Sequence, residues 1–232
     1  EVNDMNSGSY YITGTGTQTA ALITGGNRVG GVGNYSALNE IWDGTSWSEE
    51  NNMVVGRNGP ANIGTSTAAL ATGGYNPPIT YTTHAESWNG TSWTEGNNLL
   101  YGAYGGAGAG TQTAALMFGG ENPSQPAPQK NTQEWNGTSW TESGDMGNTR
   151  SWIQSAGTQT AALTSGGQPS TVNTETYDGT SWTETSNLTT ARSYNEGKLG
   201  SSASALVATG TGTAATEEWT DPVYTIKTVT VS

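Results

Sequence analysis

Apolar positions along this chain occur in short runs that are separated by glycine and polar residues. A typical run, Thr19-Ala20-Ala21-Leu22, is soon followed by the pair Gly25-Gly26, and two aromatic residues five positions apart come later. Runs of this length with glycine at their ends are typical of β-strands, because helices in globular proteins need ten or more residues. The pattern therefore predicts an all-β chain of many short strands.

The same pattern recurs in five consecutive units. Each unit contains Gly-Thr with a short Ala-Leu run, at 16–22, 64–70, 110–116 and 157–163, and in weaker form at 200–206. The first four copies are followed by a glycine pair, whereas the fifth keeps only Gly210. Two aromatic residues five positions apart then follow in every unit: Trp42 and Trp47, Trp88 and Trp93, Trp135 and Trp140, Tyr177 and Trp182, and Trp219 and Tyr224. Such a period is the signature of a repeat architecture.

Each unit is expected to form four strands. The Ala-Leu run is one strand, and Asp-Gly or Asn-Gly between the two aromatic residues predicts a hairpin, because both residues tolerate positive φ. The segment before each Gly-Thr, such as 150–156 or 192–199, supplies the first strand, and 9–13 takes that role in the first unit. The β-branched run 225–232 is expected to be the outer strand of the last unit.

Four strands in each of five serial units predict a five-bladed β-propeller as a single domain over 1–232. The units span roughly 8–53, 54–100, 101–146, 147–189 and 190–232. The paired tryptophans are expected to fill the space between neighbouring blades, because one blade cannot bury its faces alone. Residues 1–5 resemble 142–146 in the middle of a repeat, so we expect the chain to be a fragment of a longer one.

These units resemble the kelch repeat, in which a glycine pair precedes an aromatic residue with Asp or Asn, then Trp, then Arg. One unit carries Gly25, Gly26, Trp42, Asp43, Trp47 and Arg57, and another carries Gly119, Gly120, Trp135, Asn136, Trp140 and Arg150. The near-verbatim copies are also similar to repeat proteins of environmental bacteria and their phages. The chain departs from the family in its five units, where six or seven are usual, and in having Arg only at Arg57, Arg150 and Arg192. The resemblance implies binding of protein or glycan more often than catalysis.

Composition narrows the class further. Only 32% of the residues are hydrophobic and the formal net charge is -12, which disorder would also explain, but the regular aromatic spacing favours a fold. The acidic balance disfavours nucleic acid as a partner. The chain contains no cysteine, which excludes disulfides and thiolate metal sites. No run approaches the ~18 apolar residues of a membrane span, so membrane insertion is not expected.

Little in the sequence points to catalysis, to a metal or to a cofactor, so the chain is predicted not to be an enzyme. His84 is the only histidine, which excludes a site built from several histidines. Carboxylates recur at Glu40, Glu86, Glu134, Glu175 and Glu218, and again at Glu49, Glu95, Glu142 and Glu184. Because they recur in the repeats, hydrogen bonding within the fold is their expected role. An enzyme of the kelch-like oxidase or lyase kind stays as a third reading.

The differences between units locate a candidate binding face. In a propeller, the connection between the second and third strands and the connection between blades lie on one face, and here they vary in length and chemistry. The candidate ligand-binding residues on them are Arg28, Tyr35, Tyr75, Tyr81, His84, Gln125, Lys130 and Gln168. A uniform scaffold with one diversified face suits a recognition surface, although unconstrained drift of loops would give the same variation.

The sequence therefore predicts a binding and display module that recognises glycan or protein, in an extracellular or virion-surface setting such as a phage tail fibre or an adhesin. The alternative is a structural component that assembles with copies of itself in a fibre, capsid or surface layer. A homo-oligomer or larger assembly is compatible with either.

Overall fold

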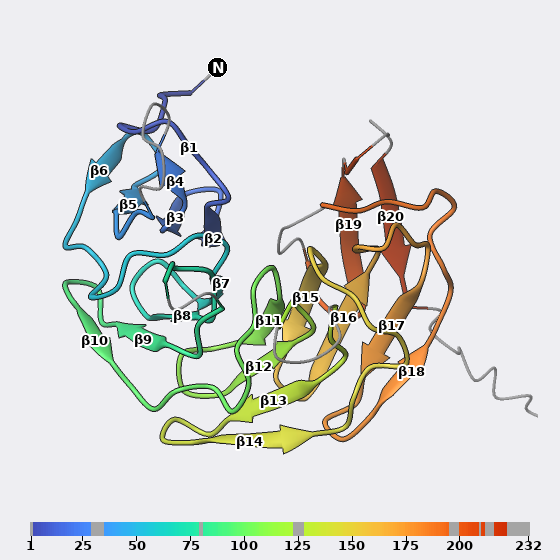
Figure 1. The fold of residues 1–232 in the computed structure, drawn as a ribbon. Helices are drawn as coiled ribbons and strands as arrows, with labels where there is room; N and C mark the ends of the chain where they lie inside the picture. Colours follow the sequence, from blue (N-terminus) through green and yellow to red (C-terminus); the bar gives the residue numbers. More distant parts are fainter. Residues whose placement is uncertain are drawn as a thin grey trace, which may run out of the picture.

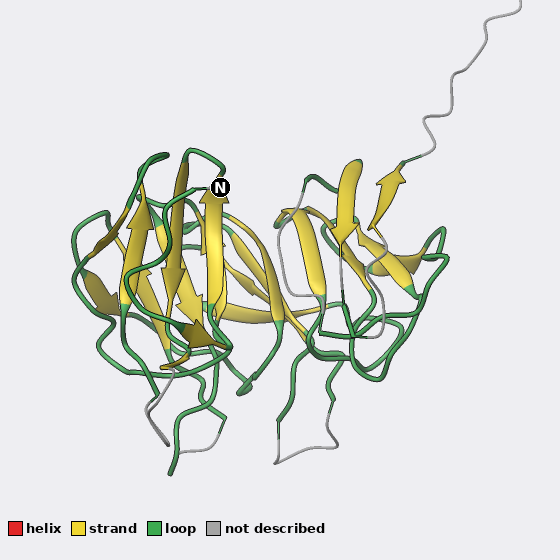
Figure 2. Cartoon of the chain, turned by 90° about the horizontal axis from the view of Figure 1, so that it is seen from above, coloured by secondary structure: helices red, strands yellow, loops and turns green. Residues whose placement is uncertain are grey.

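The computed structural model describes residues 2–28, 35–78, 81–122, 128–194, 200–208, 210–211 and 216–221. The described residues form strands and connections only (Figure 2), and none of them forms a helix long and apolar enough to cross a membrane. Sixteen strands make four antiparallel sheets of four strands each, arranged side by side along an arc (Figure 1). This is a β-propeller of four-stranded blades, as the repeat predicts.

Within each blade the strands follow the chain from the centre of the arc to its rim, and each pairs with the next. Blade 1 consists of β2 (Thr13–Thr17), β3 (Ala20–Thr24), β5 (Asn39–Trp42) and β6 (Trp47–Glu49). Blade 2 consists of β7 (Ala61–Gly64), β8 (Ala69–Thr72), β9 (Ala85–Trp88) and β10 (Trp93–Glu95).

The next two blades have the same order. Blade 3 consists of β11 (Ala107–Gly110), β12 (Ala115–Phe118), β13 (Thr132–Trp135) and β14 (Trp140–Ser143). Blade 4 consists of β15 (Gln154–Thr158), β16 (Ala161–Ser165), β17 (Thr174–Tyr177) and β18 (Trp182–Glu184). Two smaller sheets pair β1 (Ser9–Tyr10) with β4 (Asn27–Arg28), and β19 (Ser204–Ala208) with β20 (Thr216–Thr220).

The expectation of five four-stranded blades is corrected to four. The fifth unit shows only the two-stranded sheet β19–β20 among the described residues, and the outer strand expected at 225–232 lies outside them. The fifth unit also departs from the repeat in sequence: Thr220-Asp221 replaces the Asp-Gly or Asn-Gly pair, and Pro222 follows it. The glycine that adopts positive φ in the other units is missing here, so the local hairpin signal is lost in this unit.

The first strand of blade 1 also differs from the prediction. Residues 9–13 were expected to be innermost, but Ser9 and Tyr10 pair with Arg28 and Asn27 in a separate ribbon. The innermost strand is β2, which carries through Gly16 and turns at Gln18 and Thr19. In the four complete blades the glycine of this step lies at or next to the end of the innermost strand, where an added Cβ would meet the carbonyl opposite.

The predicted hairpins between the third and fourth strands are confirmed in the four complete blades. The side chain of Asp43 accepts hydrogen bonds from the N–H groups of Thr45 (2.7 Å) and Ser46 (2.8 Å). Asn89, Asn136 and Asp178 do the same in their blades. Hydrogen bonds from Ser46 and Thr45 lower the pKa of Asp43. The glycine after each of these residues has φ between 91° and 95°.

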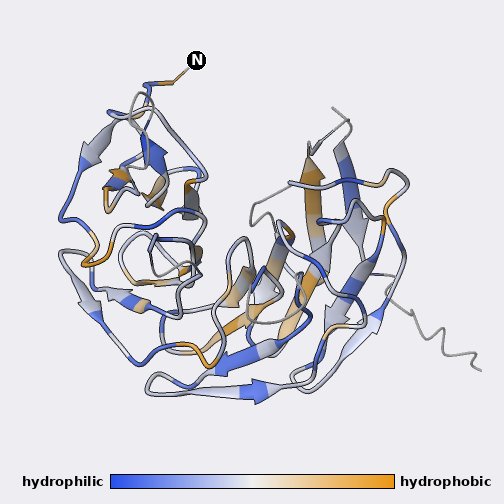
Figure 3. Ribbon diagram, in the orientation of Figure 1, coloured by the Kyte–Doolittle hydropathy of each residue, from blue (hydrophilic) through white to orange (hydrophobic). Residues whose placement is uncertain are grey.

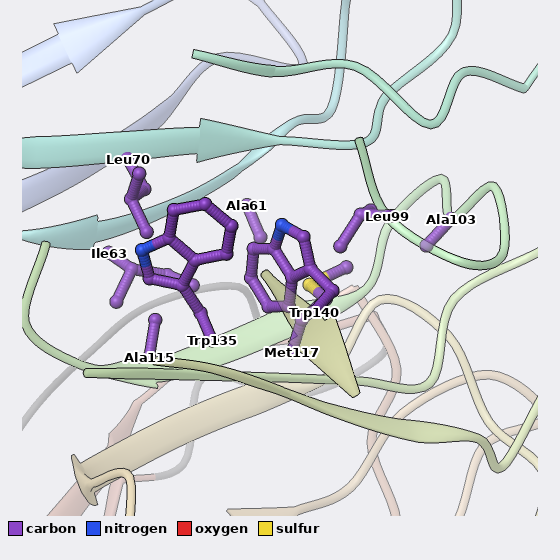
Figure 4. Close-up of a cluster of buried hydrophobic side chains, with 9 residues drawn as sticks. All are labelled: Ala61, Ile63, Leu70, Leu99, Ala103, Ala115, Met117, Trp135 and Trp140. Atoms are coloured by element: carbon purple, nitrogen blue, oxygen red, sulfur yellow. The ribbon is translucent and has the colours of Figure 1, made fainter. Parts of the chain in front are cut away.

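Neighbouring blades are held together by the paired aromatic residues, as predicted. Trp135 and Trp140 of blade 3 pack on Ile63 and Leu70 of blade 2 (Figure 4). Their ring centroids are 5.2 Å apart. Figure 3 shows the apolar colour concentrated on inner strands such as β12 and β16, and polar colours on the outer strands. The core is therefore a series of thin layers between sheets.

A buried ion pair anchors three of the units. Arg57 is fully buried and donates to Glu86 at 2.5 Å and to the carbonyl of Ala71. Arg150 pairs with Glu175, and Arg192 pairs with Glu217, in the same way. The repeated carboxylates thus act within the fold, but their predicted register is wrong in two units: the equivalent positions are Gln133 and Glu217, not Glu134 and Glu218.

All five units contribute to one central cavity at the hairpin end of the inner strands. The cavity has a volume of about 400 Å³ and is lined by the same glycine of each repeat: Gly16, Gly64, Gly110, Gly157 and Gly200. The fifth unit therefore faces the same central cavity as the four blades.

Candidate aromatic binding face

Three described residues other than glycine have a positive φ, and they lie at the other end of the inner strands. Tyr11, Trp152 and Tyr194 have φ of 57°, 51° and 54°, in the left-handed region that suits glycine. The equivalent residues of units 2 and 3 are Gly59 and Gly105, with φ of 55° and 62°. One position of the repeat is thus left-handed in all five units, and in three of them it carries an aromatic side chain.

This conformation lets each unit bond to the next around the axis. The N–H of Gly59 donates to the carbonyl of Tyr11 (2.9 Å), that of Gly105 to Gly59 (3.4 Å), and that of Trp152 to Gly105 (2.6 Å). These bonds run in series through units 1 to 4. The backbone at Tyr11 and at Trp152 is therefore held by hydrogen bonds to the neighbouring units.

Trp152 lies at the centre of the group and is 4% exposed. Its ring centroid is 5.4 Å from Tyr11 of unit 1, 4.6 Å from Tyr104 of unit 3 and 5.6 Å from Tyr194 of unit 5. The ring also covers Gly105, where an added Cβ would lie 2.7 Å from the indole. The glycine is required there because the tryptophan of the next unit occupies the space.

A chain of tyrosines continues from this centre onto the connections of units 1 and 2. Tyr104 contacts Tyr75 and Tyr81, which contact each other, and Tyr75 contacts Tyr35, all at centroid distances of 5.4 to 5.6 Å. On the other side, Tyr10 contacts Tyr11 at 5.3 Å. We call the eight residues the aromatic belt: Tyr10, Tyr11, Tyr35, Tyr75, Tyr81, Tyr104, Trp152 and Tyr194.

Polar groups border the belt. The carboxylate of Glu121 accepts hydrogen bonds from the Trp152 indole N–H (3.1 Å) and the Ser151 hydroxyl (3.0 Å). Burial raises the pKa of Tyr81, with a further contribution from the charge of Glu121. Burial and the neighbouring Tyr75 likewise raise the pKa of Tyr35. Both phenols are therefore neutral hydrogen-bond donors at physiological pH.

A small cavity lies directly beneath the belt. It has a volume of about 110 Å³ and is lined by Ile12 and Ile153, which follow belt residues in the chain, and by Asn62, Gly106 and Ser155 among others.

The belt lies on the face that the sequence predicts to be diversified. Backbone pairs join the connection between blades to the connection between the second and third strands, as between Asn58 and Tyr75, Tyr104 and Glu121, and Ser151 and Gln168. The structure therefore confirms that these two kinds of connection share one face.

The structure brings together only some of the predicted site residues. Tyr35, Tyr75 and Tyr81 are in the belt, and Gln168 is half-buried beside it through its backbone pair with Ser151. Arg28 is exposed, donates to Ser7 (2.9 Å) and lines a surface pocket together with Tyr35 of the belt.

Three other predicted residues do not join this group. His84 lies against Glu95 at 3.1 Å, at the start of strand β9, and Lys130 is 3.8 Å from Asp145. Gln125 lies outside the described residues. Within the described ranges, no group of three His, Asp or Glu side chains could hold a metal ion.

Sequence reasoning missed five belt residues and Glu121. Four of these belt residues lie in segments that the repeat predicts to be first strands, where an aromatic residue suggests packing: Tyr10, Tyr11, Trp152 and Tyr194. The available signal was the alignment of the repeat itself, which sets Tyr11, Trp152 and Tyr194 against Gly59 and Gly105. Packing does not explain why glycine and bulky aromatic residues exchange at one position. A shared positive φ does explain it.

No protein-family model matches this sequence, and no curated protein matches it either. The assignment to the β-propeller fold rests on the repeat and on the four blades described above.

Proposed function

We propose that the chain is a non-enzymatic binding module that recognises a glycan through the aromatic belt. The observation that carries the proposal is the left-handed backbone of Tyr11, Trp152 and Tyr194 at one mouth of the central axis. Bulky residues in this conformation cost about 1–3 kcal/mol each and persist where the surroundings impose them, commonly at ligand sites. Glycine would relieve the cost, and two units of the chain use it.

The exposed end of the belt has the chemistry that a sugar ring requires. Tyr10, Tyr11 and Tyr194 are 49%, 44% and 50% exposed, although each touches another ring of the belt. The C–H face of a pyranose is apolar and packs on an aromatic ring, while its hydroxyls bond to phenol and backbone groups nearby. Rigid tyrosines supply such contact area at a low entropic cost.

Charge argues against an anionic or nucleic-acid ligand. In the part of the chain that the structure describes, Arg57, Arg150 and Arg192 are buried in ion pairs, and Lys130 lies near Asp145. Arg28 is the remaining described cation, so no basic cluster is present to offset the net charge of -12. A neutral glycan is favoured on this ground.

The self-assembling alternative has less support. The outer strands β6, β10, β14 and β18 each carry an exposed glutamate, at Glu49, Glu95, Glu142 and Glu184. Charges on edge strands oppose pairing with another sheet edge. We therefore favour the binding module, displayed on a cell or virion surface such as a phage tail fibre or adhesin.

We also propose the kelch type of repeat, with the fifth unit completing a five-bladed ring. The buried pairs Arg57–Glu86, Arg150–Glu175 and Arg192–Glu217 recur at the Arg position that the resemblance singles out. The shared glycine-lined cavity supports five units around one axis.

A glycan array tests the function. The variant Tyr11→Gly/Tyr194→Gly removes the two exposed rings and places at both positions the residue that units 2 and 3 already have. We expect the native chain to bind a set of neutral glycans and the variant to lose that binding by tenfold or more. The control Tyr101→Ala removes a tyrosine outside the belt and should bind like the native chain. Absence of binding by the native chain would contradict the proposal, as would equal binding by the double variant.

A further inference from the structure

Each of the three interfaces between successive blades contains a buried leucine at the same position of the repeat. Leu22, Leu70 and Leu116 of the second strands are 0 to 1% exposed, and each lies in a core cluster with residues of the next blade. Leu163 of blade 4 is 2% exposed and packs on Ala205 and Trp219 of the fifth unit. The equivalent residue of the fifth unit, Leu206, is 37% exposed.

The opposite flank of the arc is exposed in a complementary way. In blades 2 and 3, Ala69 with Ala71 and Ala115 with Met117 are buried against the preceding blade. The equivalent residues of blade 1, Ala21 and Ile23, are only half-buried. Blade 1 therefore presents an apolar strip of the same kind with no blade packed on it.

A glutamine marks the same flank. In blades 3 and 4, the amide of Gln112 donates to the carbonyls of Ala69 and Trp88, and that of Gln159 to the carbonyls of Ala115 and Trp135. Each glutamine thus bonds the paired second and third strands of the preceding blade. Gln18 occupies this position in blade 1 and is exposed. By the repeat, its partners would be the carbonyls of Ala205 and Trp219, which pair with each other across β19 and β20.

The rim of blade 1 is already built as at the other interfaces. Asn3 donates to the carbonyl of Thr45, as Asn51 does to Thr91 and Asn97 does to Thr138 of the following blades. Glu40 accepts from the N–H groups of Asn6 and Ser7, as Glu86 does from Val54 and Val55. What this flank lacks is a sheet.

We propose that the sheet β19–β20 packs on β3 and β5 of the same chain, with Leu206 against Ala21 and Ile23 and with Gln18 bonded to Ala205 and Trp219. Figure 1 shows the two flanks apart, facing each other across the open side of the arc. The occupant is the chain's own fifth unit and not a second copy, because Gly200 already lines the same cavity as Gly16. The interface goes beyond the binding function and rests on the proposed fifth blade.

Closing this interface would also complete the binding face. The backbone bonds of the left-handed positions run from Tyr11 through Gly59 and Gly105 to Trp152. The next two in the series would join Tyr194 to Trp152 and Tyr11 to Tyr194. The exposed rings Tyr11 and Tyr194 would then be held side by side, so that a ligand bound to both would hold the ring closed.

Thiol cross-linking tests the interface without any ligand, because the chain has no cysteine. The variant Gln18→Cys/Ala205→Cys is treated with a short bifunctional thiol reagent beside the control Gln112→Cys/Ala69→Cys. In the control pair, the Gln112 side chain reaches the backbone carbonyl of Ala69 across the described interface of blades 2 and 3. We expect both to form an intramolecular cross-link in high yield. A covalent dimer of the first variant would overturn the proposal, and so would no cross-link in it while the control reacts.

Thermal unfolding supplies an independent measurement. Leu206→Ser should lower Tm by about 3 °C or more, and so should the control Leu70→Ser at the interface of blades 2 and 3. Gln18→Ala should likewise lower Tm, and Gln112→Ala is its control. If both seam variants unfold like the native chain while both controls are destabilised, the flanks do not pack. Since neither experiment involves a glycan, its outcome is separate from that of the array.

Discussion

At the scale of single residues, the left-handed position of the repeat separates stability from function. Gly59 and Gly105 adopt φ near 60° without a Cβ to strain, whereas Tyr11, Trp152 and Tyr194 adopt it with a bulky ring. Backbone hydrogen bonds around the axis join four of these positions, Tyr11, Gly59, Gly105 and Trp152, in this conformation. The exposed rings of Tyr11 and Tyr194 are therefore not required by the local fold.

Replacing Tyr11 or Tyr194 by glycine should not destabilise the protein. Relief of the strained backbone, about 1–3 kcal/mol, offsets the ~1 kcal/mol that glycine costs through the entropy of the unfolded chain. We expect the free energy of unfolding in urea to stay the same or to rise by about 1 kcal/mol. Tyr10→Gly, on the adjacent strand β1, lacks this relief and should be less stable than the native chain. Equal losses at Tyr10 and Tyr11 would mean that the left-handed backbone carries no strain.

Tyr177 predicts a change of stability at alkaline pH. Its hydroxyl donates to Glu134 at 2.5 Å, and burial together with this bond raises its pKa to about 12. The folded state holds the phenolic proton more tightly than the unfolded chain, whose tyrosine pKa is about 10. This stabilisation is complete below about pH 10 and is lost as the pH rises towards 12.

Urea unfolding at several values of pH checks this. Tyr177→Phe should be less stable than the native chain at neutral pH, where it lacks the hydrogen bond to Glu134, and should lose less of its stability between pH 10 and 12. A parallel decline of the two proteins over this range would contradict the assignment.

At the scale of elements, the blades show how a chain with little apolar content builds a core. Alanines such as Ala69 of β8 and Ala115 of β12 let the sheets approach, and the tryptophans of the third and fourth strands fill the rest, as Trp88 and Trp93 do against blade 1. The outermost strands are short and carry a glutamate opposite a buried position, such as Glu95 opposite Glu86. The edges are thus protected by charge and not by covering elements.

Removing this protection should cause association. The quadruple variant in which Glu49, Glu95, Glu142 and Glu184 are replaced by threonine exposes four uncharged edges of high β-propensity. We expect concentration-dependent aggregation by light scattering at concentrations where the native chain is monodisperse. The matched variant with glutamine at the four positions separates charge from β-propensity. An unchanged size for both variants would show that the edges are protected by something else.

At the scale of the whole molecule, one residue connects nearly all units. The ring of Trp152 contacts Tyr11 of unit 1 and Tyr194 of unit 5, and it covers Gly105 of unit 3. It also reaches unit 2, because its Cη2 atom would lie 3.4 Å from a Cβ added at Gly59. Interfaces of a repeat protein otherwise involve neighbours only. Trp152 therefore couples units that are not adjacent in the sequence.

Trp152→Gly should weaken this coupling. The glycine suits the left-handed backbone, so the loss reflects the ring alone, and removal of a buried tryptophan costs about 3–5 kcal/mol. We expect a lower Tm with a broader transition in calorimetry, because the units unfold less cooperatively. Trp140→Ala removes an equally buried ring from one interface and should lower Tm while the transition stays sharp. Similar profiles for the two variants would contradict a coupling role.

The sequence by itself determined the blades. The short Ala-Leu runs, the glycine pairs, the Asp-Gly and Asn-Gly turns and the aromatic pairs are local signals. They predicted four-stranded units, their hairpins and the filling between sheets. These features follow from the chemistry of residues that are adjacent in the sequence. They could be identified because they recur from unit to unit. The diversified face could also be predicted, together with Tyr35, Tyr75 and Tyr81.

Tertiary structure decided the rest, because it depends on contacts between units. Only the three-dimensional arrangement shows that Tyr11, Trp152 and Tyr194 share a left-handed backbone, since φ at one position is imposed by hydrogen bonds from another unit. It also set the register of Gln133 and Glu217 and limited the complete blades to four. Sequence patterns report what a segment can form locally, whereas a site that lies across five units exists only after they are arranged around one axis.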